Sequence, residues 1–197
     1  MNNVEYRSIS FQFNPEEDKK LKGYAAVFNS LSEDLGGFKE KIMPGAFTRT
    51  LSSKRDILAL GFHDERVLLG RKSAGTLVLN EDEHGLYVEI TPPNTTEARD
   101  IMEHVRLGNL KNMSFGFFVR KDDISEEDGQ VIRELKDIEL IEVSIVPTPA
   151  YVDTEIALRS LPKKETKKRI SEFRRRLFDA ENFGSIETDN NNNNIDK

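Results

Sequence analysis

The chain has 197 residues, of which 37% are hydrophobic and 32% are charged, so it suits one globular domain with extensions. It contains no cysteine, which excludes disulfide bonds, thiolate metal sites and a cysteine nucleophile. The N-terminus lacks a basic segment followed by an apolar run, and no stretch reaches the ~20 apolar residues of a membrane span. We therefore expect a cytosolic protein that makes no membrane contact.

The net charge of −6 is unevenly distributed. Residues 162–178 carry eight basic and two acidic side chains, whereas residues 179–197 carry five acidic side chains and one lysine. The body of the chain is therefore acidic, and an acidic body repels nucleic acid. We expect no specific nucleic-acid site, and a basic segment that contacts an acidic protein or is simply solvated.

The first 160 residues are expected to form one β-rich domain. Period-two alternation and turn signals predict the following strands: Val4–Phe13, Leu21–Phe28, Phe38–Met43, Asp56–His63, Thr76–Leu79, Leu86–Thr91, Met113–Arg120, Val131–Lys136 and the run that begins at residue 138 and stops at Pro147. A short helix is predicted after Pro44. A longer helix is predicted with its N-terminal cap at residues 94–96 and its C-terminal cap at Gly108.

The character of the chain changes near residue 160. Residues 161–184 are predicted to form a basic amphipathic helix, with Ile170, Phe173 and Leu177 on one stripe. Such a helix buries little apolar surface alone, so we expect it to dock on a partner or on the body. Residues 185–197 are rich in asparagine and polar, and are expected to be disordered.

Three of the predicted strands combine an apolar face with an opposite face that holds one reactive side chain. The apolar stripes are Leu58, Leu60 and Phe62; Met113, Phe115, Phe117 and Val119; and Ile141, Val143 and Ile145. The opposite faces carry Ala59, Gly61 and His63; Ser114, Gly116 and Phe118; and Leu140, Glu142 and Ser144.

His63, Ser114 and Glu142 are the residue types of a serine nucleophile with its base and supporting acid. Histidine accepts the serine proton, and the carboxylate fixes the imidazole tautomer and stabilises the imidazolium. Small neighbours such as Gly61 and Gly116 leave room for a substrate backbone. The three residues lie far apart in the sequence, so only the fold can bring them together.

Other interpretations of each residue stay open on the pattern alone. His63 also suits a surface histidine, Ser114 a residue at a helix exit or strand edge, and Glu142 a solvated sheet face. If Glu142 is buried, its carboxylate needs a partner. The pair His63-Asp64 has no second histidine at ligand-like spacing, so we expect no metal, and the chain lacks a phosphate-binding glycine loop or a GxSxG elbow, so we expect no cofactor.

Five segments taken in order resemble the prohead (capsid maturation) protease family of tailed bacteriophages. They are GYAAVFNS, IMPGAFTRTL, ALGFHDERVLLGR, LKNMSFGFFV and ELIEVSIVPTPAY, and they span roughly residues 20–158. The resemblance implies a serine endopeptidase with a closed, mainly antiparallel β-barrel like that of herpesvirus assemblin. It places the catalytic pair on His63 and Ser114 and points to Glu142 as the third member, with Asp64 and Glu139 as outside candidates.

The same resemblance implies a role inside the assembling procapsid, in the cytoplasm of a bacterial host. Such a protease cleaves scaffold or the scaffold-like N-terminal region of the major capsid protein, and trims itself, and it can form a homo-oligomer. The basic segment then serves for packaging or docking. The alternatives are a non-enzymatic assembly or scaffolding factor with a β-barrel core, and a β-barrel binding module of unknown ligand.

Overall fold

The structure, a computed structural model, describes residues 4–10, 20–147, 168, 170–173 and 175. The chain divides into two compact units, residues 1–161 and residues 162–197. In the second unit the described residues are helical and belong to the predicted basic helix. Leu177 and the asparagine-rich tail lie outside the described residues. No helix in the described ranges is both long and apolar enough to cross a membrane.

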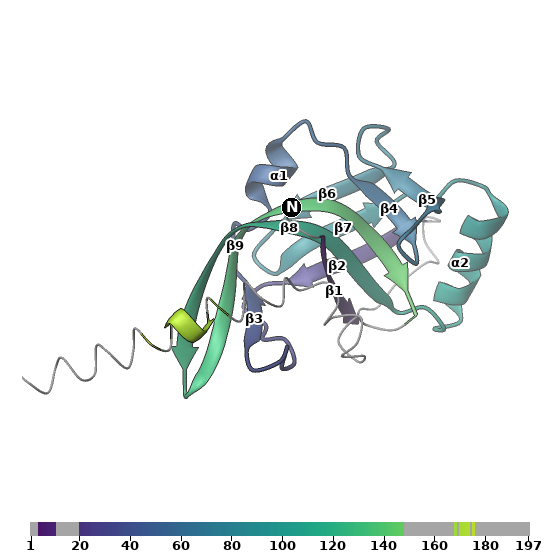
Figure 1. Cartoon of the computed structure of the whole chain (residues 1–197). Helices are drawn as coiled ribbons and strands as arrows, with labels where there is room; N and C mark the ends of the chain where they lie inside the picture. Colours follow the sequence, from purple (N-terminus) through teal and green to yellow (C-terminus); the bar gives the residue numbers. More distant parts are fainter. Residues whose placement is uncertain (1–3, 11–19, 148–167, 169, 174, 176–197) are drawn as a thin grey trace, which may run out of the picture. The chain divides into compact units, whose positions relative to one another are not determined.

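The first unit is mainly β, as predicted (Figure 1). Its elements are β1 (Glu5–Ser10), β2 (Leu21–Val27), β3 (Lys39–Ile42), α1 (Thr48–Ser52), β4 (Leu58–Gly61), β5 (Asp64–Arg71), β6 (Leu77–Glu81), β7 (Gly85–Ile90), α2 (Thr96–Arg106), β8 (Asn112–Glu127) and β9 (Gln130–Val146). The predicted N-terminal cap of the longer helix is confirmed, because the Thr95 hydroxyl accepts from the Ala98 N–H. The C-terminal cap is Leu107, and the predicted Gly108 is the next residue, at φ 74°.

The strands form two sheets. The larger has the order β1-β8-β9-β4-β5, with β3 added parallel to β9, and the smaller has the order β2-β7-β6. No ladder joins the two sheets within the described ranges, so the expected closed barrel is not found. Where β1 faces β2, a cavity of about 260 Å³ lies between β1, β2 and β3. At the other junction of the two sheets, Arg71 and Thr76 are joined by hydrogen bonds. These bonds belong to the turn that connects β5 to β6 and do not form a ladder between the sheets.

The core lies between the sheets and is rich in aromatic side chains. Phe47 packs against Phe28 and Phe115, and Phe115 stacks on Phe117 with ring centroids 5.1 Å apart. The apolar face predicted for β8 is confirmed, because Met113, Phe115 and Phe117 are buried in this core. The opposite face of β8 therefore points away from it.

The hairpin of β8 and β9 is longer than the sequence predicts. The charged stretch between residues 121 and 130 continues both strands, and the turn contains only Asp128 and Gly129, at φ 50° and 75°. Two central residues with positive φ are typical of a type I′ turn. The predicted strands Val131–Lys136 and 138–146 are therefore one strand, β9.

A β-bulge changes the faces of β9. Gly116 pairs with Glu142 and Phe117 pairs with Leu140, so Ile141 is the extra residue. Leu140 joins Val143 and Ile145 in the core, while Ile141 is only half-buried. The prediction that Ile141 packs with the core and Leu140 faces away is wrong, because one extra residue reverses the alternation.

The faces predicted for β4 are also wrong. Ala59 packs in the core, and a side chain at Gly61 would collide with Ile101 of α2, so these residues form the inner face. Leu60 pairs with Ser144 on the outer face, and Phe62 is 46% exposed. The sequence also failed to predict β5, because its charged start resembles a loop.

Candidate active site

The outer face of the larger sheet carries two rows of small or polar residues. Residues that pair on neighbouring strands project to the same side. Ser8, Ser114 and Ser144 form one row across β1, β8 and β9, and Tyr6, Gly116 and Glu142 form the next. Since the inner side of β8 is the aromatic core, both rows face away from it.

His63 reaches this face through a strained turn. Gly61 pairs with Asp64, so Phe62 and His63 are the two residues of the β4–β5 hairpin turn, at φ 59° and 60°. For side chains other than glycine this conformation costs roughly 1–2 kcal/mol per residue, and such strain collects at functional sites. The turn redirects His63 from the inner side of β4 to the outer face of β9.

The imidazole of His63 contacts Glu142 and Tyr6. Its Nδ1 lies 2.7 Å from Glu142 Oε1, and its ring meets the Tyr6 ring edge-on, with centroids 4.6 Å apart and an interplanar angle of 67°. Because a carboxylate oxygen accepts hydrogen bonds, Nδ1 carries the hydrogen in this contact and Nε2 is the basic nitrogen. A histidine in this tautomer can accept a proton at Nε2.

Glu142 is buried with both carboxylate oxygens occupied. Oε1 bonds to His63, and Oε2 accepts from the Ser144 hydroxyl at 2.5 Å. Glu142 is 5% exposed, so these two contacts supply the partners that a buried carboxylate requires. Ser144 thus fixes the rotation of the carboxylate that faces His63.

Gly116 leaves the space in which these side chains meet. A Cβ atom at Gly116 would lie 2.8 Å from Glu142 Oε1 and 2.8 Å from Tyr6 Cε1. Both distances are shorter than real Cβ contacts, so any larger residue would displace the carboxylate or the ring. The sequence-based expectation that Gly116 keeps space open agrees with this geometry.

Ser114 lies two residues before Gly116 on the same face of β8. It is 0% exposed, and its hydroxyl has no hydrogen-bond partner in the described part of the chain. The structure thus brings His63 and Glu142 into contact and places Ser114 in the neighbouring row of the same sheet face, without a hydrogen bond to either. Because β8 has a strand on each side, the interpretation of Ser114 as a strand-edge residue does not fit.

The outside candidates for the acidic role, Asp64 and Glu139, bond to arginine side chains. Asp64 bonds to Arg66, which lowers the Asp64 pKa to about 2. Glu139 bonds to Arg120 and Arg55, and these guanidinium groups lower its pKa, with the Arg120 hydrogen bond as the largest cause. Among the three carboxylates, Glu142 makes the contact with histidine.

Sequence reasoning missed Tyr6 and did not assign a role to Ser144. Alternation had placed Ser144 on the face of Glu142, and two residues on one face of a strand can bond to each other. Tyr6 gave no signal, because its neighbours depend on how β1 pairs with β8. Among the described residues, no group of three His, Asp or Glu side chains is arranged to hold a metal ion.

A carboxylate bonded to histidine Nδ1 and a serine on the same sheet face are three residue types of a serine hydrolase triad. The profile of the Caudovirus prohead serine protease family matches residues 3–169, and the chain belongs to this family. It is 32% identical over 152 residues to the prohead protease of Enterobacteria phage HK97, and 30% identical over 144 residues to that of Escherichia phage T5.

These alignments cover 74% and 71% of the chain. The chain spans 63% and 62% of the length of the two relatives. No solved structure matches the chain significantly.

Proposed function

We propose that the chain is a serine endopeptidase in which Ser114 is the nucleophile, His63 the general base and Glu142 the supporting acid. The observation that carries this proposal is the 2.7 Å contact of His63 Nδ1 with Glu142, on the same sheet face as the buried, unpartnered Ser114 hydroxyl. A buried hydroxyl without a partner is unfavourable for stability and needs an explanation, which a catalytic role would supply for Ser114.

The geometry supports the following reaction. As Ser114 Oγ attacks a peptide carbonyl carbon, His63 Nε2 takes the hydroxyl proton, and Glu142 stabilises the imidazolium. His63 then donates this proton to the leaving amine as the C–N bond breaks, which leaves an acyl-enzyme on Ser114. A water molecule then attacks the ester carbonyl while His63 Nε2 accepts one of its protons. His63 returns this proton to Ser114 Oγ as the C–O bond breaks, which releases the carboxylic acid product and regenerates Ser114.

Access to Ser114 requires a local rearrangement. The residue is completely buried, whereas the His63 side chain is 29% exposed. A peptide carbonyl therefore reaches Oγ only when neighbouring groups move aside and bring Ser114 within hydrogen-bond distance of His63. Catalytic hydrogen bonds that tighten when the substrate binds are common in proteases.

The substrates we propose are capsid precursors. The two relatives are named prohead proteases. By similarity to them, we propose that this chain cleaves scaffold or the scaffold-like N-terminal region of the major capsid protein, and also cleaves itself. We propose that these cleavages take place inside the procapsid, in the host cytoplasm. We also propose that its sheets share their origin with the assemblin barrel. The alternative is a non-enzymatic assembly factor, which needs no reactive serine.

Labelling with a fluorophosphonate separates these functions. The proposed protease reacts covalently at Ser114, and peptide mapping by mass spectrometry locates the adduct there. In parallel, the intact mass of the purified chain falls with time in the wild type and stays constant in a Ser114→Ala variant. Absence of both the adduct and the mass loss would support the assembly factor.

Substitution of the proposed acid tests its role. Glu142→Gln preserves the shape of the side chain but presents no negative charge to an imidazolium at His63. Loss of the matching carboxylate lowers turnover by as much as ~10⁴-fold in a serine protease, so we expect a loss on the order of 10³–10⁴-fold in the rate of capsid-precursor cleavage. Glu139→Gln, on the same strand, serves as the control and retains activity. Equal rates for both variants would move the acidic role to another residue.

Gly116→Ala tests the space beside the site. The added methyl group meets Glu142 Oε1 and Tyr6 Cε1 at 2.8 Å, so the carboxylate has to move away from His63. A displacement of about 1 Å in a catalytic group costs on the order of 10²-fold in rate, and we expect that loss in fluorophosphonate labelling while circular dichroism stays unchanged. Wild-type labelling of the alanine variant would show that the 2.8 Å contacts relax without consequence.

A further inference from the structure

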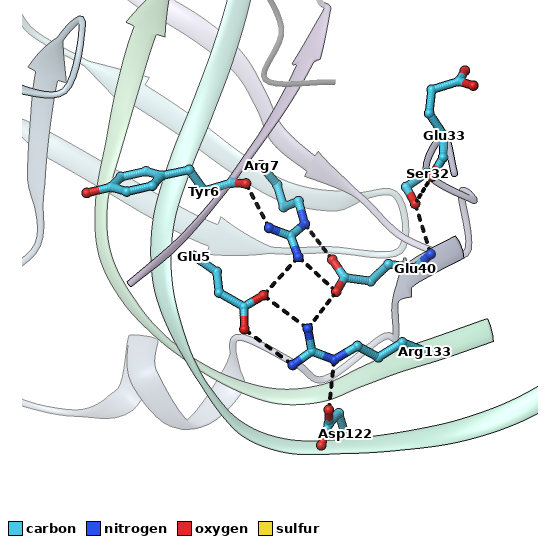
Figure 2. A network of polar contacts seen from close by, with 8 residues as sticks. All are labelled: Glu5, Tyr6, Arg7, Ser32, Glu33, Glu40, Asp122 and Arg133. Carbon is cyan, nitrogen blue, oxygen red and sulfur yellow. Dashed lines mark hydrogen bonds and ion pairs between the residues drawn. The ribbon is translucent and has the colours of Figure 1, made fainter. Parts of the chain in front are cut away.

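Strand β1 has two faces with different contacts. Tyr6 and Ser8 belong to the rows of the candidate site, whereas Glu5 and Arg7 point to the other side of the strand. Figure 2 shows this arrangement, with the Tyr6 ring directed away from the charged side chains on the far side of β1. The N-terminal strand therefore connects the site to a second group of residues.

This second group is a buried charge cluster of Glu5, Arg7, Glu40, Asp122 and Arg133. Arg7 Nε bonds to Glu40 at 2.6 Å and Arg7 Nη2 to Glu5 at 2.8 Å. Arg133 bonds to the same two carboxylates at 3.1 Å and to Asp122 at 2.8 Å. These five side chains are 2–7% exposed. The cluster fixes β1 to β3, β8 and β9 at one position.

Tyr6 is the residue of β1 that contacts the base of the candidate site. Its ring edge packs on the His63 imidazole at 4.6 Å, and its Cε1 atom fills the space next to Gly116. Burial, followed by the negative charges of Glu142 and Glu65, raises the Tyr6 pKa, so the phenol stays neutral beside the carboxylate. The neutral ring lies against His63 and borders the same space beside Gly116 as Glu142 Oε1.

His63 needs such a support because it stands on a two-residue turn. Its hydrogen bond at Nδ1 fixes one atom, and the ring can still rotate about that atom. The edge-to-face contact with Tyr6 fixes the plane of the imidazole and hence the direction of Nε2.

We propose that Tyr6 is a positioning residue, which holds the His63 imidazole in the plane that directs Nε2 toward Ser114, and that the buried charge cluster holds Tyr6 in place. This inference rests on the proposed function of His63 as a base. It makes β1, at the start of the described chain, a part of the catalytic apparatus.

Two substitutions at Tyr6 test the proposal, with the rate of fluorophosphonate labelling at Ser114 as the readout. Tyr6→Phe retains the ring edge and is expected to keep the wild-type labelling rate. Tyr6→Leu removes the ring, and we expect the limiting labelling rate to fall about tenfold, which is the size of a typical contribution from an aromatic pair. The probe concentration that gives half of the limiting rate is expected to stay unchanged. Tyr24→Leu is the matched control, because the Tyr24 ring meets His84 in the same geometry, 4.5 Å and 78°, away from the site.

A second readout does not depend on chemistry at Ser114. The imidazole Nδ1–H of His63 is bonded to a buried carboxylate, so it gives a downfield proton resonance, assigned by its loss in His63→Ala. We expect this resonance to persist in Tyr6→Phe and Tyr24→Leu and to broaden or vanish in Tyr6→Leu. Wild-type labelling and resonance in Tyr6→Leu, or equal losses in Tyr6→Phe, would overturn the proposal. If neither the wild type nor any variant is labelled, the proposed function of Ser114 fails. The resonance then still shows whether Tyr6 holds the His63 imidazole in place.

Discussion

Replacing Ser114 by alanine is expected to abolish proteolysis and to stabilise the fold. Loss of the nucleophile lowers turnover by roughly 10⁶-fold in a serine protease. The Ser114 hydroxyl is also buried without a partner, and a buried polar group left unsatisfied costs about 1–3 kcal/mol. Its removal leaves no unpaired group behind, so we expect the free energy of unfolding to rise by about 1 kcal/mol.

Ser144→Ala is the matched control, because Ser144 pairs with Ser114 across the ladder and is equally buried. Its hydroxyl donates to Glu142, so its removal deprives a buried carboxylate of a donor. We expect Ser144→Ala to lower the free energy of unfolding by about 1–3 kcal/mol and to reduce proteolysis only in part. Urea unfolding of both variants measures this difference. A Ser114→Ala variant that is destabilised and still cleaves would contradict the assignment.

The sequence predicted the three residue types of the candidate site, and Ser114 and Glu142 stand in strands whose alternation is easy to recognise. On β8 this alternation is regular, so the face of Ser114 followed directly from its neighbours. On β9 the position of Glu142 agreed with prediction, but its neighbours Leu140 and Ile141 exchanged roles. A bulge depends on the pairing of two strands, and single-strand patterns do not contain it.

The approach of His63 to the site was predictable only through the family resemblance. Phe62 and His63 occupy a two-residue turn of a kind that favours asparagine and glycine. Because neither residue is typical of such a turn, their sequence predicts that the strand continues through them. The packing of β4 and β5 overrides this local preference. The inner face of β4 was assigned to the wrong residues because its small residues, Ala59 and Gly61, face the core in place of its larger ones.

The buried charge cluster could not be predicted at all. Charged residues in an acidic, 32% charged chain are expected at the surface, and the members of the cluster come from four separate strands. Only the pairing of β1 with β8 and of β3 with β9 brings them together. The cluster therefore forms only when the strands have paired, and its loss is expected to lower the stability of the whole first unit.

Arg133→Met is expected to cause the largest loss of stability. Arg133 bonds to Glu5, Glu40 and Asp122, and its own side chain is 4% exposed. Burial lowers its pKa, but these carboxylates raise it above the ordinary arginine value, so the guanidinium remains charged. In the variant, the carboxylates of Glu5, Glu40 and Asp122 stay buried, and Arg7 is the one cation of the cluster that remains. Removing one partner of a buried pair costs about 3–5 kcal/mol, and we expect a loss of that size.

Urea unfolding against Arg66→Met measures this effect, because the Arg66 side chain is 89% exposed and its surface pair with Asp64 contributes little to stability. If Arg133→Met does not fold, Arg133→Lys retains the charge without the planar fork that reaches three carboxylates, and is expected to lose less stability. Equal stability of Arg133→Met and Arg66→Met would show that the cluster does not hold β1. Tyr6 and Ser8 would then depend for their positions on the β1–β8 ladder alone, and the candidate site would be independent of the charges behind it.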